Sequence, residues 1–218
     1  MKILCLSDVH GEGAGLKDIL PVASEVDVVV VAGDLTHLGG YAEAESVFAP
    51  LLESGARIAA VAGNMDREGV GRWLDEKAIN IHGRGTTIGQ VGFMGLGGGT
   101  PSPFGTPWEI ADAEAAGILA SGLTAISACP YKVLVSHAPP RGTKIDRSFA
   151  GMHLGSGAVR DFLLAGSVDL CICGHIHESP GEDTLGRALC VNVGPFKNGR
   201  YALIAVEDGR AHVTWRKR

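Results

Sequence analysis

Seven polar side chains of metal-binding type stand directly after apolar runs in this 218-residue sequence. The runs are rich in Val, Ile, Leu and Ala, a composition expected of buried β-strands. Polar groups at the ends of buried strands are costly unless they bind something. These residues are Asp8, His10, Asp34, Asn64, His137, His175 and His177.

The residue types indicate a divalent metal site. Carboxylate, imidazole and amide oxygen without thiolate suit a borderline-hard ion such as Mn²⁺, Fe²⁺ or Zn²⁺. Seven ligands are too many for one tetrahedral ion, but with one bridging carboxylate they suit two ions about 3.5–4 Å apart. Such a pair lowers the pKa of a bridging water and clamps a phosphate for in-line displacement. The ligand set therefore points to phosphate-ester chemistry.

The elements that must position these residues alternate between strands and helices. Helix-like segments at 15–23, 41–54 and 66–77 separate the early strands, an order that favours an α/β fold with a parallel sheet. Ligands of such sheets bind outside the carboxyl ends of the strands. The last three strands are expected to form a meander, with Asp208-Gly209 as a hairpin turn. Strand-like runs occur at 2–7, 27–32, 57–62, 90–95, 132–137, 168–174, 188–193, 201–206 and 211–215.

The motifs D-x-H, G-D, G-N-x-D, a lone His after a strand, and G-H-x-H, in this order, resemble the calcineurin-like metallophosphoesterase superfamily. The resemblance runs from Asp8 to His177 and, in strand order, to the C-terminus. It implies a four-layer α/β/β/α sandwich of two mixed sheets with the metal site at the strand C-terminal ends. One domain over residues 1–218 is expected. The small size and the "VNVGP" turn resemble the compact, capless phosphodiesterase branch of that superfamily.

The resemblance also implies a role for each ligand and the identity of the cofactors. The expected cofactors are two divalent ions, with manganese ranked first and iron, nickel or zinc as alternatives. A hydroxide bridging the ions would attack the phosphorus of the ester, and a phosphodiester is favoured over a monoester. Asp34 would bridge the ions. One ion would be held by Asp8, His10 and His177, and the other by Asn64, His137 and His175.

The sequence departs from the family pattern at Met65. Many members carry a histidine there, which protonates the leaving group, and a methionine can do no acid–base chemistry. Small members often lack this histidine too, so its loss does not imply inactivity. His37, three residues beyond Asp34, and His153, before an expected helix start, are the candidate catalytic substitutes.

Further candidates lie close to these residues in the sequence. Asp66 is placed in the catalytic group as an acceptor that orients a neighbouring ligand. Asn64, Arg141 and Arg147 are the candidate substrate contacts, although a solvated charged loop is the alternative reading for the two arginines. The loops at 95–109 and 138–154 are expected to shape the substrate pocket.

The composition argues against nucleic-acid and membrane partners. The formal net charge is −5, and aromatic residues make up only 6% of the chain, so duplex nucleic acid is not expected. No run approaches the roughly 18 apolar residues that a membrane span requires. The five cysteines indicate reduced, buried thiols of a cytoplasmic protein. A small phosphate ester is the expected partner, and the oligomeric state is left open.

Competing functions fit the sequence less well. A dinucleotide-binding Rossmann protein is disfavoured because Leu16 stands where the third glycine of G-x-G-x-x-G is required. A phosphomonoesterase or a protein phosphatase would use the same site on another substrate. A non-catalytic scaffold would be expected to have lost ligands, whereas all seven positions here hold ligand-type residues.

Overall fold

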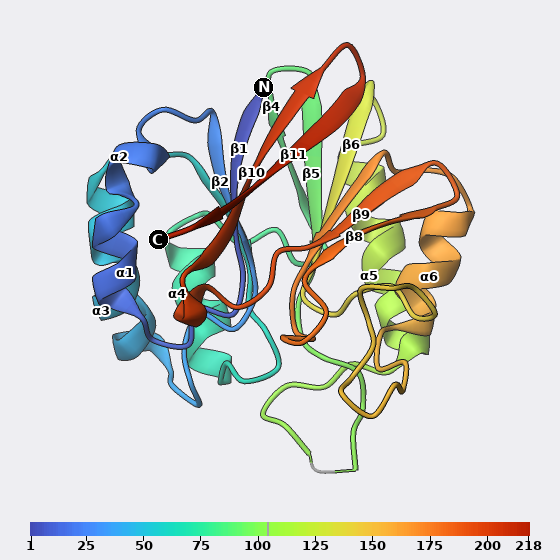
Figure 1. Ribbon diagram of the computed structural model, residues 1–218, viewed down its shortest axis with the longest axis horizontal. Coiled ribbons are helices and arrows are strands. Elements are labelled where there is room, and N and C mark those ends of the chain that lie inside the picture. The colour runs from blue at the N-terminus through green and yellow to red at the C-terminus, as the bar shows by residue number, and fades with distance from the viewer. Residues whose placement is uncertain (104) are drawn as a thin grey trace.

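The computed structural model describes residues 1–103 and 105–218, and its two sheets lie between two layers of helices (Figure 1). The first sheet has the strand order β11-β10-β1-β2-β3, and the second has the order β4-β5-β6-β7-β9-β8. Strands β1, β2 and β3 are parallel, as are β5, β6, β7 and β9, whereas the remaining pairs are antiparallel. Both sheets are therefore mixed, and the four-layer sandwich is confirmed.

The bounds of the elements follow the apolar runs closely. The first sheet comprises β1 Lys2–Leu6, β2 Val28–Ala32, β3 Ile58–Val61, β10 Arg200–Glu207 and β11 Arg210–Lys217. The second comprises β4 Gly85–Ile88, β5 Val91–Leu96, β6 Tyr131–Ser136, β7 Leu170–Cys173, β8 Gly181–Leu185 and β9 Ala188–Asn192. The helices are α1 Gly13–Asp18, α2 Leu20–Ala23, α3 Tyr41–Glu53, α4 Glu68–Glu76, α5 Asp112–Ala125, α6 Gly157–Leu164 and the short 3₁₀ helix η1 Phe196–Asn198.

Three hydrophobic clusters fill the spaces between the four layers. Alternate residues of β1 point to opposite faces, so Ile3 packs between the two sheets while Leu4 packs against α3 and its neighbours. The second sheet is covered in the same way, with Leu119 of α5 and Val159 of α6 packed beneath it. Because the central strands are buried on both faces, they appear in the sequence as continuous apolar runs.

The predicted C-terminal meander is wrong in its first strand. Strand β9 pairs in parallel with β7 in the second sheet, whereas β10 pairs with β1 in the first sheet. The chain crosses between the sheets at η1, where the buried Phe196 donates its backbone N–H to the carbonyl of Ser7. Only β10 and β11 form the expected hairpin.

Other local predictions need correction too. The helix expected over 15–23 is two short helices, α1 and α2, with Pro21 in the first turn of α2, where proline is tolerated. The elements β4, β8 and α5 had no prediction. All five cysteines are free and buried, as expected. No helix among the described residues combines the length and the apolar character that crossing a membrane requires.

Candidate metal centre

The seven predicted ligands come together where the parallel strands of both sheets end. Asp8 and His10 follow β1, Asp34 follows β2, and Asn64 follows β3. The second sheet supplies His137 after β6, and His175 and His177 after β7. Figure 1 shows this end at the bottom of the view, where the loop after β5 (green) and the loop after β6 (gold) project beyond the strands. The candidate centre therefore lies between the two sheets.

Strained backbone is concentrated at these positions. Asp8, His10, Asp34 and His175 have φ values of 53°, 48°, 51° and 68°. This left-handed region is unfavourable for residues with a side chain and costs about 1–3 kcal/mol each. Four of the seven candidate ligands share this conformation, and such strain gathers at functional sites.

The glycines of the G-N and G-H motifs allow the ligand loops to approach one another. A side-chain carbon at Gly63 would collide with the Asp34 carboxylate, and one at Gly174 would collide with Ser7 and Asp8. Only glycine fits at these two positions, because the neighbouring atoms are backbone, site carboxylates or the buried Ser7 side chain, whose hydroxyl donates to the carbonyl of Ala32 at 3.0 Å.

One cluster of donor atoms is formed by Asp8, His10 and His177. The Nε2 atoms of the two histidines lie 3.3 Å apart. His177 Nε2 is 3.1 Å from Asp8 Oδ1, and His10 Nε2 is 4.0 Å from the same oxygen. Ligand atoms bound about 2.1 Å from one ion lie about 3.0–3.4 Å from each other in octahedral or tetrahedral geometry. Two of the three separations lie in this range, and the three donor atoms together are close enough to hold one divalent ion.

A second cluster is built around His137. Its Nε2 lies 2.8 Å from Asn64 Oδ1 and 3.4 Å from Asp34 Oδ1. Its Nδ1 lies 2.8 Å from the carbonyl of Ala32, so a proton on Nδ1 leaves Nε2 free as a ligand. The His175 ring packs edge-on against that of His137, with centroids 4.9 Å apart.

Asp34 lies between the two clusters. Its Oδ1 is 3.4 Å from His137 Nε2, and its Oδ2 is 3.6 Å from His10 Nε2. The two oxygens of one carboxylate thus face different donor sets, which is the geometry required of a bridging ligand.

Burial and charge set the protonation of the candidate ligands. Burial disfavours the charged form of His137, but the Asp34 carboxylate outweighs burial and raises the pKa of His137 to about 9. Burial, together with the charge of His137, lowers the pKa of His175 to about 4. Burial also opposes ionisation of Asp8, yet the hydrogen bond from His177 and the charge of His137 hold the pKa of Asp8 well below its usual value. The surroundings therefore favour the ionised forms of the two ligand carboxylates, Asp8 and Asp34.

Asp66 is buried beneath the centre and accepts hydrogen bonds from both ligand loops. Its oxygens accept the backbone N–H groups of Leu35, Thr36 and Gly63 at 2.8–3.0 Å and the Thr36 hydroxyl at 2.7 Å. It therefore ties the loop that carries Asp34 to the loop that carries Asn64. This placement fits a positioning role for Asp66.

Asn192, at the end of β9, supports the other side of the centre. Its Nδ2 donates to the carbonyl of Ile176, between His175 and His177, at 2.9 Å and to the carbonyl of Ile145 at 3.1 Å. Asn192 is fully buried. From the sequence alone, a plain turn residue was the favoured interpretation of Asn192 and a brace for the G-H-x-H loop the alternative; these contacts support the alternative.

A cavity of about 380 Å³ adjoins the second cluster. Asn64 and His175 form one part of its wall, and Arg141 and His153 form another. The loop after β5 closes it with residues that include Thr100, Pro101 and Ser102. The pocket-forming roles predicted for the two loops thus match this cavity within the described residues.

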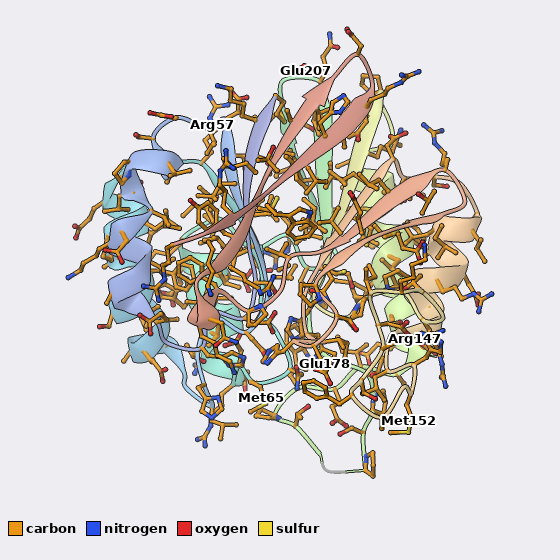
Figure 2. The ribbon with its side chains drawn as sticks, viewed as in Figure 1. Arg57, Met65, Arg147, Met152, Glu178 and Glu207 are labelled. Carbon is orange, nitrogen blue, oxygen red and sulfur yellow. The ribbon has the colours of Figure 1, made fainter. Side chains whose placement is uncertain are left out.

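The remaining predicted residues lie at different distances from the centre. His37 is exposed, and its ring centroid is 5.4 Å from that of His10. Arg147 is exposed and lies on the α6 side in Figure 2, well separated from Met65 in that view. Arg147 is not among the described residues that line the cavity. Of the two candidate arginines, the structure brings only Arg141 to the cavity wall.

Comparisons with known proteins agree with this arrangement. The sequence matches the calcineurin-like phosphoesterase family over residues 1–179. It is also 32% identical over 203 residues to the uncharacterized protein MJ1162 of Methanocaldococcus jannaschii, covering 89% of this chain and 88% of that protein.

Solved structures share the fold at low sequence identity. TT1561 of Thermus thermophilus is 18% identical, with a TM-score of 0.79 over 98% of this chain and 97% of that one. A dimetal phosphatase from Danio rerio is 14% identical, with a TM-score of 0.73 over 100% of this chain and 96% of that one. The family match covers most of the chain and includes every residue of the candidate centre, so this protein belongs to the calcineurin-like phosphoesterase family.

Proposed function

We propose that this phosphoesterase hydrolyses phosphodiesters at a centre of two divalent ions, with Mn²⁺ as the first choice. The observation that carries the proposal is Asp34, whose two carboxylate oxygens face separate donor clusters at 3.4 Å and 3.6 Å. Asp8, His10 and His177 would hold one ion, and Asn64, His137 and His175 the other. The similarity in fold to a dimetal phosphatase from Danio rerio is consistent with this centre.

The ions would supply an activated water and positive charge that neutralises the phosphate. The side chains of the protein would position the phosphate ester and determine which esters bind. Arg141, at the cavity wall, would contact a phosphate oxygen with its guanidinium group. Asn64 lies both in the second cluster and in the cavity wall, so it would orient the ester at the point where the cavity meets the centre.

The lining of the cavity supports a diester over a monoester. Among the described lining residues, Arg141 is the only arginine or lysine, and Glu109 and Asp112 are acidic. Apart from the ions, a monoester dianion would meet one cationic side chain and two carboxylates there, whereas a diester carries only one negative charge. The uncharged wall at Pro101, Pro103 and Leu154 offers space for its second organic group.

The proposal is tested by assaying metal-free and Mn²⁺-loaded protein on bis-p-nitrophenyl phosphate and p-nitrophenyl phosphate. We expect Mn²⁺-dependent turnover of the diester, its loss in Asp34→Asn, and unchanged turnover in the control Asp161→Asn, an exposed residue of α6. Turnover of the monoester alone would be consistent with the proposed two-metal centre but would contradict the preference for diesters. No turnover of either ester with Mn²⁺, Fe²⁺, Ni²⁺ or Zn²⁺ would contradict the proposal and favour a binding role for the fold.

A further inference from the structure

A carboxylate with no part in the metal-ligand pattern is buried beside the cavity. Asp146, in the loop after β6, is fully buried. It accepts backbone N–H groups from Gly142 at 3.0 Å, Thr143 at 3.0 Å and Gly155 at 3.2 Å. These bonds hold the two ends of the loop together and fix the direction of the carboxylate.

The remaining strong contact of Asp146 is to His153. The distance from His153 Nδ1 to Asp146 Oδ1 is 2.6 Å. The side chain of His153 keeps 32% of its surface exposed, and the residue lines the cavity together with Asn64 and His175. Since Nδ1 is engaged by the buried carboxylate, Nε2 is the ring nitrogen left to act in the cavity. A backbone bridge to Arg147 further fixes the position of His153.

The other candidate, His37, lacks these features. It is exposed and lies beside His10, at the cluster on the other side of Asp34. Within residues 1–103 and 105–218, its side chain has no carboxylate partner, and only its backbone N–H approaches Glu43, at 3.5 Å. No hydrogen-bond partner among the described residues therefore orients the imidazole of His37 or selects one of its tautomers.

We propose that His153 is the proton donor to the leaving group of the diester, and that Asp146 is the residue that positions it. This inference rests on the proposed function. As the oxygen of the attacking water bonds to phosphorus and the bond to the leaving oxygen breaks, the Nε2 proton of the His153 imidazolium passes to that leaving oxygen, and an alcohol leaves. The imidazole remains neutral, with its Nδ1 proton held by Asp146, and takes a new proton from water. The leaving group thus departs toward the cavity. Because His153 donates the proton, the methionine at position 65 does not prevent acid catalysis.

The test is a series of methyl aryl phosphodiesters whose leaving groups run from dinitrophenol to unsubstituted phenol, assayed with Mn²⁺. We expect His153→Gln to lower kcat about 100-fold or more for the phenyl ester and to have little effect on the dinitrophenyl ester, which needs no proton. Asp146→Asn should show the same trend with a smaller loss. Imidazole added to His153→Ala should restore turnover of the phenyl ester selectively.

Two comparison variants and a spectroscopic measurement separate this role from a structural one. His37→Gln and His212→Gln, the latter on the exposed strand β11, should keep the wild-type dependence on the leaving group. In the NMR spectrum of ¹⁵N-histidine-labelled protein, the downfield Nδ1 proton of His153 should disappear in Asp146→Asn.

The outcomes distinguish the inference from the function on which it rests. An active wild type with an equal loss across all leaving groups in His153→Gln would overturn the inference and leave the proposed function standing. A leaving-group effect in His37→Gln instead would transfer the role to that residue. If wild-type protein hydrolyses no ester, the proposed function fails, and the inference fails with it.

Discussion

Met65 contributes its backbone to the candidate centre. Its N–H donates to Asp34 Oδ1 at 2.8 Å, and its carbonyl accepts the N–H of Leu38 at 3.0 Å. Both contacts are independent of the side chain, so the histidine that many relatives are expected to carry can be replaced here without loss of the loop geometry. The methionine differs from that histidine in having no proton to donate.

At the same scale, His137 makes the metal-free protein sensitive to alkaline pH. Burial disfavours its charged form, but the Asp34 carboxylate raises its pKa from 6.5 to about 9. The charged His137 stabilises the folded state. This stabilisation is fully present below pH 6.5 and is lost as the pH rises through about 9. We expect the free energy of unfolding of the metal-free protein to fall by about 3 kcal/mol over this window. Urea denaturation at several pH values measures it. In His137→Gln, the free energy of unfolding should not change between pH 6.5 and 9. If it does not change in the wild-type protein either, the raised pKa of His137 is contradicted.

The second prediction at the residue scale concerns the stability of proteins in which Asp66 or its partner is replaced. Asp66→Ala would leave three backbone N–H groups and the Thr36 hydroxyl buried without an acceptor, and we expect it to lower the free energy of unfolding by about 3–5 kcal/mol. Thr36→Val removes only one donor and should cost about 1 kcal/mol. Chemical denaturation gives both values. A stable Asp66→Ala protein with an altered leaving-group dependence would instead support a catalytic role for Asp66.

At the scale of elements, polar side chains that are not ligands hold the loops around the centre and its cavity. Strand β9 contributes Asn192, which holds the loop of His175 and His177 to the loop after β6. On the loop after β5, Glu109 accepts four hydrogen bonds from Ser102 and Thr106. The shape of the cavity thus depends on contacts within the loop after β5 and on contacts between segments that are distant in the sequence.

Replacement of Asn192 tests this dependence. Asn192→Ala removes both donations to the carbonyls of Ile145 and Ile176, and we expect about 2 kcal/mol of destabilisation. We also expect weaker Mn²⁺ binding, by about 10- to 100-fold, because an orienting contact of two ligands is lost. Isothermal titration calorimetry measures the affinity. Asn198→Ala, an exposed asparagine of η1, is the matched control. Equal affinities in the two variants would show that the loop keeps its geometry without Asn192.

At the scale of the whole molecule, the candidate centre joins the two sheets. Each donor cluster draws residues from both, with Asp8 and His10 meeting His177, and Asn64 meeting His137. Bound ions would therefore act as cross-links between the halves of the sandwich, and their loss would weaken the contact between the sheets at one end.

Metal addition should consequently raise the thermal stability of the entire molecule. At a free Mn²⁺ concentration 100 times the Kd of a site, linkage adds about 2.7 kcal/mol of stability. This corresponds to an increase in Tm of about 5–10 °C for a chain of this size. Differential scanning calorimetry with Mn²⁺ and with EDTA measures the shift. Asp34→Asn should abolish most of it, and an unchanged wild-type Tm would argue against a metal centre between the sheets.

The sequence by itself determined the fold class and the set of candidate ligands. Strands buried on both faces must be continuously apolar, so polar residues after Leu6, Ala32, Val61, Ser136 and Cys173 were visible as exceptions. The glycines after apolar runs indicated loops at strand ends, and the structure adds that those of the G-N and G-H motifs allow close approach of the ligand loops. These properties depend on local chemistry and on the order of motifs along the chain.

Only the tertiary structure decided how residues without such a local pattern are used. Asp146, Asn192 and His153 lie in loops or at a strand end of ordinary composition. Asn192 contacts Ile145 across 47 positions of the sequence, and the cavity brings His153 beside Asn64, which follows a strand of the first sheet, so their surroundings depend on how the chain folds. The sequence likewise did not predict that β9 belongs to the second sheet, because the apolar residues of a strand do not specify the strand with which it pairs. Long-range pairing is set by the packing of the whole core, and therefore no short stretch of sequence contains it.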